Sequence, residues 1–190
     1  MRLIAVTLPE VRDDDARIIA SLLDSVVDIV HLRKPDAGVD CCRAILEQLS
    51  AEHRSRIVIH DYPELYSEFS LLGIHINKRV SALPNGYLGL RTRSCHSLED
   101  VVRFRDEFDY LFLSPIFDSI SKVGYSSQFS HEELFRASSE GIIDERIVAL
   151  GGVTLDKISY LESLGFGGAA MSGAIYSIAA INNTNALLHR

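Results

Sequence analysis

The feature that most constrains this chain is an alternation, repeated along its length, of short apolar runs with segments of helical spacing. The apolar runs are rich in Val, Ile, Leu and Tyr, which is typical of buried β-strands. They lie at Leu3–Val6, Ile29–Leu32, Arg56–Ile59, Gly73–Ile76, Tyr87–Leu90, Tyr110–Leu113, Arg146–Ala149 and Gly168–Met171. The sequence therefore predicts eight strands.

Apolar residues three and four positions apart follow most of these strands and predict helices. The predicted helices are Asp14–Leu23, Val39–Leu49, Leu98–Phe104, Glu132–Ala137 and Leu155–Leu164. Because parallel neighbours need crossover connections, the alternation predicts a parallel sheet covered by helices. Eight units favour closure as an α/β fold of the (β/α)8, or TIM barrel, type. A doubly wound open sheet would need a glycine-rich turn after the first strand, and Thr7–Val11 contains no glycine.

The length of 190 residues suits one domain, because it can bury one sizeable core and is short for two. We therefore predict a single barrel domain over residues 1–190. The connection between the fourth and fifth strands, Asn77–Gly86, is too short and too interrupted for a full helix. An abbreviated fourth crossover helps eight units fit into a chain of this length.

Composition excludes several kinds of partner. The chain has 19 Lys and Arg against 26 Asp and Glu, for a net charge of −7. Nucleic acids and anionic membranes need a clustered positive field, so we expect neither as a partner. The three cysteines, Cys41, Cys42 and Cys95, lack metal-ligand spacing, which indicates a reduced compartment. The sequence shows neither a signal peptide nor a membrane-spanning apolar run, so we expect a cytoplasmic location. The sequence does not decide between a monomer and a homo-oligomer.

In a (β/α)8 barrel the active site lies at the C-terminal ends of the strands. Arg33, after the second strand, would be costly there unless it pairs with a carboxylate such as Asp61 or with a substrate anion. Asp61 stands alone as an acidic residue at a strand end in the first half of the barrel, so we expect no permanent protein-bound metal. The polar candidates at the strand ends are His31, Arg33, Lys34, His60, Asp61, Asn77, Lys78, Ser94, Cys95, His96, Ser119, Ser121 and Lys122.

Two glycine-containing turns follow the last two strands. Gly151-Gly152 and Ser172-Gly173 place flexible backbone and a helix start where such barrels hold phosphate through main-chain N–H groups. The alternative is that these glycines only permit tight turns. Small residues around one basic side chain in Ser119–Gly124 predict a lid that brings Lys122 onto the substrate phosphate.

His96 is the candidate for proton transfer. It follows a strand and precedes a helix for which Ser97 and Asp100 form a capping-box pattern, so its imidazole can point into the mouth of the barrel with a near-neutral pKa. The alternative is a surface or capping histidine. His31 and His75 lie within strand patterns and are candidates for lumen or core histidines.

Six motifs, in order along the chain, connect it with a known family. They are Val30–Arg33, Ile57–Asp61, Ser94–Glu99, Tyr110–Lys122, Ala149–Val153 and Ala170–Ile175. Together they resemble the thiamine phosphate synthase superfamily, which includes a thiazole tautomerase (TenI-like) branch. The similarity runs from Met1 to about Ser177. It implies a barrel enzyme of thiamine biosynthesis whose partner is a phosphorylated thiazole.

The resemblance to the synthases is incomplete at the substrate positions. Synthases share a Gln-x-Arg-x-Lys motif for the pyrimidine diphosphate; here His31 replaces the glutamine, and only Arg33 and a displaced Lys34 remain. The family's Asn-Asp pair appears as His60-Asp61, and the second magnesium-binding aspartate falls near Val80. The resemblance therefore implies an incomplete magnesium site.

The tautomerase branch has a histidine at the position of His31 and a Ser-x-His segment whose histidine is His96. This resemblance implies proton transfer by His96 that converts the ylidene isomer of a carboxythiazole phosphate into the aromatic one, with no cofactor required. This isomerase is our first hypothesis, a divergent synthase that uses magnesium is the alternative, and a non-catalytic binding or regulatory member is the third. The expected substrate contacts are His31, Arg33, His60, Asp61, Ser94, Ser119, Ser121 and Lys122.

Overall fold

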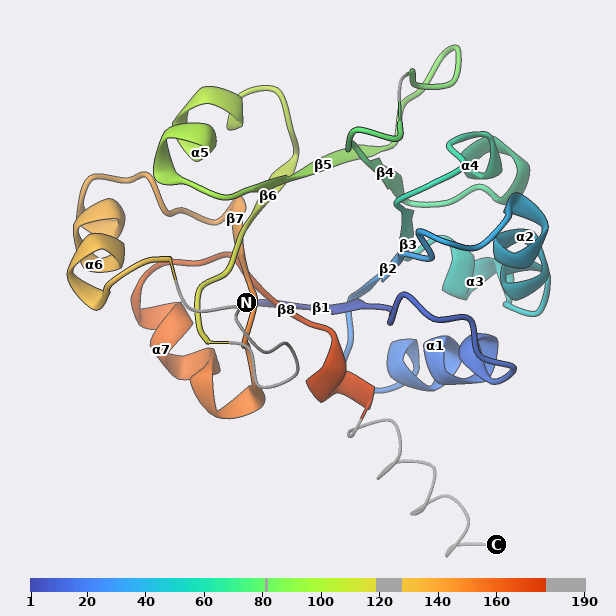
Figure 1. The fold of residues 1–190 in the computed structure, drawn as a ribbon, viewed down its shortest axis with the longest axis horizontal. Helices are drawn as coiled ribbons and strands as arrows, with labels where there is room; N and C mark the ends of the chain where they lie inside the picture. Colours follow the sequence, from blue (N-terminus) through green and yellow to red (C-terminus); the bar gives the residue numbers. More distant parts are fainter. Residues whose placement is uncertain (81, 119–127, 177–190) are drawn as a thin grey trace, which may run out of the picture. The chain divides into compact units, whose positions relative to one another are not determined.

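The computed structural model describes residues 1–80, 82–118 and 128–176. Its eight parallel strands follow one another in sequence order and form a closed barrel, so the predicted (β/α)8 fold is confirmed (Figure 1). The strands are β1 (Arg2–Val6), β2 (Ile29–Leu32), β3 (Ile57–Ile59), β4 (Gly73–His75), β5 (Leu90–Cys95), β6 (Tyr110–Leu113), β7 (Ile147–Leu150) and β8 (Gly168–Met171).

The longer helices of the described residues bury one face and expose the other, whereas the short segments Ala51–Arg54 and Leu155–Lys157 bury no residue. In the first of the longer helices, Ile18, Ile19 and Leu22 are buried, whereas Arg17 is exposed, as the spacing of its apolar residues predicts. The helices are α1 (Asp15–Leu23), α2 (Val39–Glu47), α3 (Ala51–Arg54), α4 (Glu64–Phe69), α5 (Leu98–Phe104), α6 (His131–Ser139), the 3-10 turn η1 (Leu155–Lys157) and α7 (Ile158–Ser163).

The chain divides into two compact units. One, called here the β2–β4 unit, contains Ile4–Leu90 and the chain from Ser172 onward. The other, the β5–β8 unit, contains Met1–Leu3 and Arg91–Met171. Each unit has a strand that is buried along its whole length, β2 in the first and β6 in the second. Buried parallel strands of this kind read as continuous apolar runs, which is why the sequence predicts them with the same bounds.

In the β2–β4 unit, the register places Val30 beside Ile57 and Val58 beside Gly73. Figure 1 draws α2, α3 and α4 on one side of these strands. Arg56, directly before β3, fastens this strand to the end of α1, because its guanidinium donates to the carbonyl oxygens of Leu23 at 2.7 Å and Asp28 at 2.9 Å. The N-terminal end of β3 is thereby held by polar contacts.

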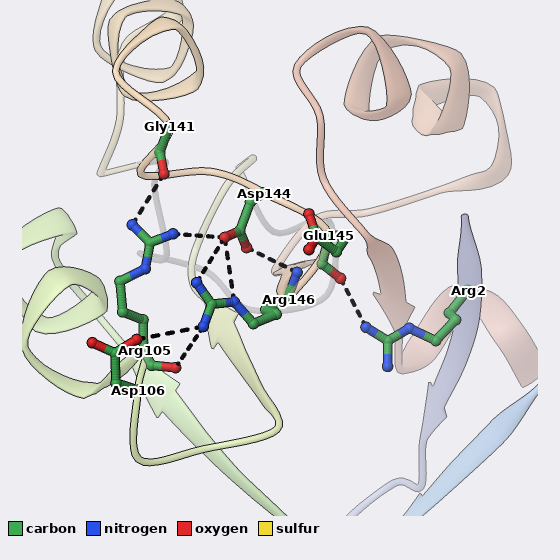
Figure 2. Close-up of polar contacts among 7 residues, drawn as sticks. All are labelled: Arg2, Arg105, Asp106, Gly141, Asp144, Glu145 and Arg146. Carbon is green, nitrogen blue, oxygen red and sulfur yellow. Dashed lines mark hydrogen bonds and ion pairs between the residues drawn. The ribbon is translucent and has the colours of Figure 1, made fainter.

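In the β5–β8 unit, a charged cluster precedes β7 (Figure 2). Asp144 Oδ2 accepts from Arg105 Nη2 at 2.6 Å and from Arg146 Nη2 at 3.0 Å. Arg105 also donates to the carbonyl oxygen of Gly141 at 3.0 Å, which joins the end of α5 to the loop after α6. Arg2 of β1 donates to the carbonyl oxygen of Glu145 at 2.9 Å. These contacts tie β1, α5 and the start of β7 together.

The fifth strand differs from its prediction. The sequence predicts it at Tyr87–Leu90, whereas β5 spans Leu90–Cys95. The residues before it form a turn in which the Tyr87 hydroxyl donates to the carbonyl oxygen of Leu90 and accepts from the N–H of Ile74 at 2.8 Å. An apolar search misses this strand because only Thr92 and Cys95 are buried in it and its other residues are mostly polar. One of them, Arg93, places its guanidinium over the Phe104 ring, 4.1 Å from the ring centroid. A polar strand of this kind has no apolar run to detect.

Two short helices, α3 and α4, are missing from the sequence prediction. Their lengths are 4 and 6 residues, too short for a periodic apolar face to be recognised. Between β4 and β5, residues 76–80 and 82–89 contain no helix, in agreement with the abbreviated fourth crossover.

No helix among the described residues is long and apolar enough to cross a membrane. The cysteines Cys41, Cys42 and Cys95 are free, as the sequence predicts. Burial raises the pKa of the Cys42 and Cys95 thiols to about 11, so both are protonated and unreactive near neutral pH.

Candidate functional site

Three buried histidines meet in the β2–β4 unit. His31 lies in β2, His60 directly follows β3 and His75 ends β4, and their exposed fractions are 0%, 6% and 3%. His31 Nδ1 and His60 Nε2 are 2.8 Å apart and share a hydrogen bond. The rings of His60 and His75 are stacked at 4.0 Å between centroids with 13° between their planes. The alternation of side chains along parallel strands brings these three imidazoles to one place.

Two members of the cluster, His31 and His60, are neutral near pH 7. Burial lowers the pKa of His31 well below its usual value of 6.5, and the neighbouring His75 lowers it further. Burial also lowers the pKa of His60, and His75, His31 and two nearby arginines act in the same direction. With both rings neutral, one of the facing nitrogens of His31 and His60 donates and the other accepts. His31 and His60 are thus uncharged hydrogen-bonding groups and nitrogen donors.

The loop after β2 is held by a buried ion pair. Lys34 Nζ lies 2.7 Å from Asp15 Oδ2, and the two side chains are 0% and 1% exposed. The ammonium also donates to the carbonyl oxygens of Leu8 at 3.0 Å and Glu10 at 2.7 Å. All of its donors are therefore used in joining the β1–α1 loop to the β2–α2 loop. The sequence placed Lys34 among the candidates for substrate diphosphate; the structure assigns it to this internal pair instead.

His96 occupies the first position after β5 and is exposed. Its Nδ1 lies 2.9 Å from the carbonyl oxygen of Ser114, which directly follows β6. A carbonyl oxygen only accepts, so Nδ1 carries the proton and Nε2 of the neutral ring is left as an acceptor. Ser97, the next residue, is the cap of α5 and accepts from the N–H of Asp100 at 3.1 Å. His96 is therefore not the helix cap, and its ring is oriented by the Ser114 carbonyl. Ser94 lies inside β5 rather than after it.

The turn after β7 needs its two glycines. Gly151 and Gly152 have φ of +92° and +62°. A Cβ on Gly152 would lie 2.3 Å from the carbonyl oxygen of Asp118, so only glycine fits beside that segment. Lys157 closes the turn by donating to the carbonyl oxygen of Gly152 at 2.8 Å. The tight-turn explanation accounts for both glycines, and phosphate binding by this turn stays a prediction.

Ser172 directly follows β8, and residues 173–176 are helical. The hydroxyl of Tyr176, in this last described turn, accepts from the N–H of Leu8 at 3.0 Å. Phosphate binding at Ser172 and Gly173 also stays a prediction. Ser119, Ser121 and Lys122, and with them the proposed lid Ser119–Gly124, lie outside the described residues.

Comparison with known proteins identifies the family. The model of the family described as thiamine monophosphate synthase matches residues 3–175. The chain belongs to this family. Curated relatives named thiamine-phosphate synthase include one from Photorhabdus laumondii, 29% identical over 171 residues, covering 85% of this chain and 79% of the relative. Another, from Bacteroides thetaiotaomicron, is 25% identical over 158 residues, covering 77% and 76%.

Solved structures agree with this assignment. A thiamine phosphate pyrophosphorylase from Bacteroides thetaiotaomicron superposes with a TM-score of 0.84 at 36% identity, covering 93% of this chain and 85% of the other. One from Pyrococcus furiosus has a TM-score of 0.70 at 17% identity, covering 91% and 86%, and shows the shared fold. The names of these relatives correspond to the synthase alternative of the sequence analysis rather than to its first hypothesis, the tautomerase.

The magnesium site that the synthase resemblance implies does not fit the residues of this member of the thiamine monophosphate synthase family. Asp61 directs Oδ1 to the guanidinium of Arg79, and not to Arg33 as the sequence analysis considered. Val80, at the position of the second carboxylate, is buried and has no ligand atom. Magnesium is usually held by one or two free carboxylates together with substrate oxygens. Here the one carboxylate is engaged by a cation.

Two of this chain's departures from the synthase pattern touch each other. His31 and His60 stand where the resemblance implies an amide, and they share the 2.8 Å hydrogen bond. Asn77 orients the backbone beside them by donating to the carbonyl oxygen of His60 at 2.6 Å. Strand periodicity indicated that His31 and His75 face a lumen or core. It could not predict the contact with His60, because that contact depends on the register between β2 and β3 and on the orientations of the rings, and the periodicity of one strand gives neither.

Proposed function

We propose that this chain acts in thiamine biosynthesis on a phosphorylated thiazole, and that it carries out the reaction for which its relatives are named. That reaction joins a pyrimidine diphosphate to thiazole phosphate, forming a carbon–nitrogen bond and releasing diphosphate. The observation that carries the proposal is the family match over residues 3–175, together with the synthase names of the relatives at 25% and 29% identity.

Cationic side chains of the β2–β4 unit suit the diphosphate in this proposal. Arg33 is half-buried after β2, and Lys78 and Arg79 are exposed after β4. Guanidinium groups bind phosphate oxygens with two parallel hydrogen bonds and offset the negative charge that develops on a leaving diphosphate. The backbone of Arg33 is fixed by Thr7, whose Oγ1 accepts from the Arg33 N–H at 2.8 Å. Its side chain therefore extends from a rigid position.

A second candidate, the thiazole tautomerase, is favoured by the geometry at His96. The Ser114 carbonyl fixes the Nδ1–H tautomer, which leaves Nε2 available to remove a proton and return it at another atom. This proton shift needs no metal, and the poor fit of Asp61 and Val80 to magnesium does not affect it. The aromatic ring gained by the product drives the isomerisation.

One assay separates the candidates. Purified protein is supplied with the pyrimidine diphosphate and thiazole phosphate, and separately with the isolated ylidene isomer, each with magnesium and with a chelator. Formation of thiamine phosphate supports the proposed reaction. Isomerisation above the spontaneous rate, without thiamine phosphate, replaces it with the tautomerase. Binding of thiazole phosphate without turnover of either substrate set rejects both reactions and identifies a binding protein.

Substitutions of Arg33 and His96 test the role proposed for each residue. Arg33→Gln should raise the KM for the pyrimidine diphosphate if Arg33 binds it, while Arg43→Gln, which alters a surface ion pair, should not. His96→Gln should lower the isomerisation rate by about 100- to 10,000-fold if His96 transfers the proton. His53→Gln is the matched surface control. Isomerisation by His96→Gln at the parent rate would remove the reason for the second candidate.

A further inference from the structure

The histidine cluster of β2, β3 and β4 is a set of nitrogen donors separate from Arg33 and His96, the residues given roles in the two proposed reactions. Three imidazoles contribute one nitrogen each, and these nitrogens all lie within 4.8 Å of one another. Cysteine and carboxylate are absent from this group of described residues. Neutral imidazole suits zinc, copper, iron and nickel, whereas magnesium and calcium prefer oxygen. The chemistry of the cluster therefore selects a different class of ion from the one that the synthase resemblance implies.

We propose that His31, His60 and His75 form a binding site for a borderline divalent transition metal of the zinc class. Three histidine ligands leave one coordination position open, as in zinc sites that bind water or a substrate atom. The ligands come from three consecutive strands, so the backbone holds them more rigidly than loops would. The inference does not depend on which reaction the chain catalyses.

The present ring positions resemble those of ligands before metal enters. Zinc–imidazole bonds of about 2.0–2.1 Å place two tetrahedral ligand nitrogens about 3.3 Å apart. The facing nitrogens of His31 and His60, now 2.8 Å apart across a hydrogen bond, need to separate by about half an ångström. The metal then takes the place of the shared proton.

The stacked pair requires a larger change. A ring nitrogen binds metal along its lone pair, which lies in the plane of the ring. The planes of His60 and His75 differ by only 13°, so their lone pairs do not converge until one ring turns about its Cβ–Cγ bond. His31 is already inclined to both, at 74° and 73°. We expect metal binding to break the stacking of His60 on His75 and to leave His31 close to its present orientation.

A nearby carboxylate offsets part of the charge that a dication would bring. Asp61 follows His60 in the chain; its Oδ1 pairs with Arg79, and its Oδ2 is buried without a hydrogen-bond partner among the described residues. A buried anionic oxygen without a partner is costly, and a cation in its neighbourhood lowers that cost. The competing explanation is a core histidine cluster satisfied by its own hydrogen bond and stacking, for which added metal would change nothing.

The first experiment uses the unaltered protein. Metal-stripped protein is titrated with Co²⁺, which gives intense visible absorption in a tetrahedral nitrogen site, and with Zn²⁺ while the imidazole NMR signals are followed. The proposal expects one equivalent of metal, a tetrahedral cobalt spectrum, and movement of the signals of three of the seven histidines. Absence of the cobalt bands, or movement of surface histidine signals alone, would overturn it.

The second experiment assigns the ligands. His31→Gln and His60→Asn replace each imidazole with an amide of similar polarity. His53→Gln and His131→Gln are the controls, because His53 is half-buried, His131 is exposed, and both lie outside the cluster. Loss of an outer-sphere partner of a metal ligand costs about 10- to 100-fold in affinity, so loss of a ligand should cost at least about 100-fold. Zinc affinity and the zinc-induced rise in melting temperature should fall in the first two variants and persist in the controls. The reverse pattern would show an adventitious surface ion.

Discussion

The two units of this chain hold their polar groups in different ways. In the β5–β8 unit, Arg105, Asp144 and Arg146 form a charged cluster before β7 whose side chains are 24%, 19% and 36% exposed. In the β2–β4 unit, the polar groups are almost completely buried: the Lys34–Asp15 pair and the imidazoles of His31, His60 and His75. The charged cluster before β7 is thus in contact with water, whereas the polar groups of the β2–β4 unit are shielded from it.

This difference matters because water decides what a polar contact contributes. A charge that keeps some hydration loses little when its partner is removed, whereas a dry one loses most of its stabilisation. We therefore expect changes in the two units to have distinguishable effects.

The largest effect is expected at the Lys34–Asp15 pair. Lys34→Met leaves the Asp15 carboxylate buried without its cation, which should cost about 3–5 kcal/mol in the free energy of unfolding. Urea denaturation measures it. Arg43→Met, which breaks a surface pair, should cost at most about 1 kcal/mol. The double variant Asp15→Leu with Lys34→Met should recover most of the loss, because no unpaired charge remains. A loss for Lys34→Met no larger than for the control would show that the pair is hydrated.

The next effect is a loss of stability in mild acid. The unfolded histidines take up protons near pH 6.5, and the folded His31 and His60 resist protonation because burial lowers their pKa values. Stability is therefore complete above pH 6.5 and falls as the pH is lowered, by up to about 1.4 kcal/mol per pH unit for each histidine. Urea midpoints across this range measure the slope. His31→Gln with His60→Asn should flatten it, and an unchanged slope would place the sensitive groups elsewhere.

The smallest effect is expected at the hydrated cluster. Burial alone raises the pKa of Asp144, but hydrogen bonds from Arg146 and the charges of Arg146 and Arg105 outweigh it, and the pKa is lowered from 3.8. Its contribution is present above pH 3.8 and is lost as the pH falls through the folded pKa. Asp144→Asn should cost about 1–2 kcal/mol, because the group is partly exposed. The deficit should be the same at pH 7 and pH 5, unlike that of the histidines.

Much of the fold could be predicted from sequence because buried parallel strands are apolar along their whole length. β2, β6 and β8 have the predicted bounds. The sequence prediction missed β5 because most of its residues are polar, including Arg91 and Arg93, so an apolar search stops at the turn before it. The N-cap at Ser97 was predictable for a different reason: it depends only on residues adjacent in the chain.

The candidate site was less predictable. Strand ends indicated candidate residues for it, including His31, His60 and His96. Pairings across strands were not predictable, because they depend on register and on rotamers: Lys34 pairs with Asp15, and Asp61 with Arg79. One signal could have helped, the free-energy cost of burying a charged side chain without a partner. A lysine beside a run of buried residues needs an anion, and Asp15 is the acidic residue at the buried face of the preceding helix.

The helix-free connection between β4 and β5 has a consequence for protein engineering. At Gly86 no atom lies within 4 Å of the position of a Cβ, and Asn85 beside it is exposed. A peptide tag or a small domain inserted at Asn85–Gly86 would displace nothing. Three residues on, the Cβ position of Gly89 lies 2.5 Å from the Tyr66 ring, so an insertion there would push this ring out of its contact with Tyr87. We therefore expect the fourth crossover to accept an insertion at Asn85–Gly86 but not at Gly89.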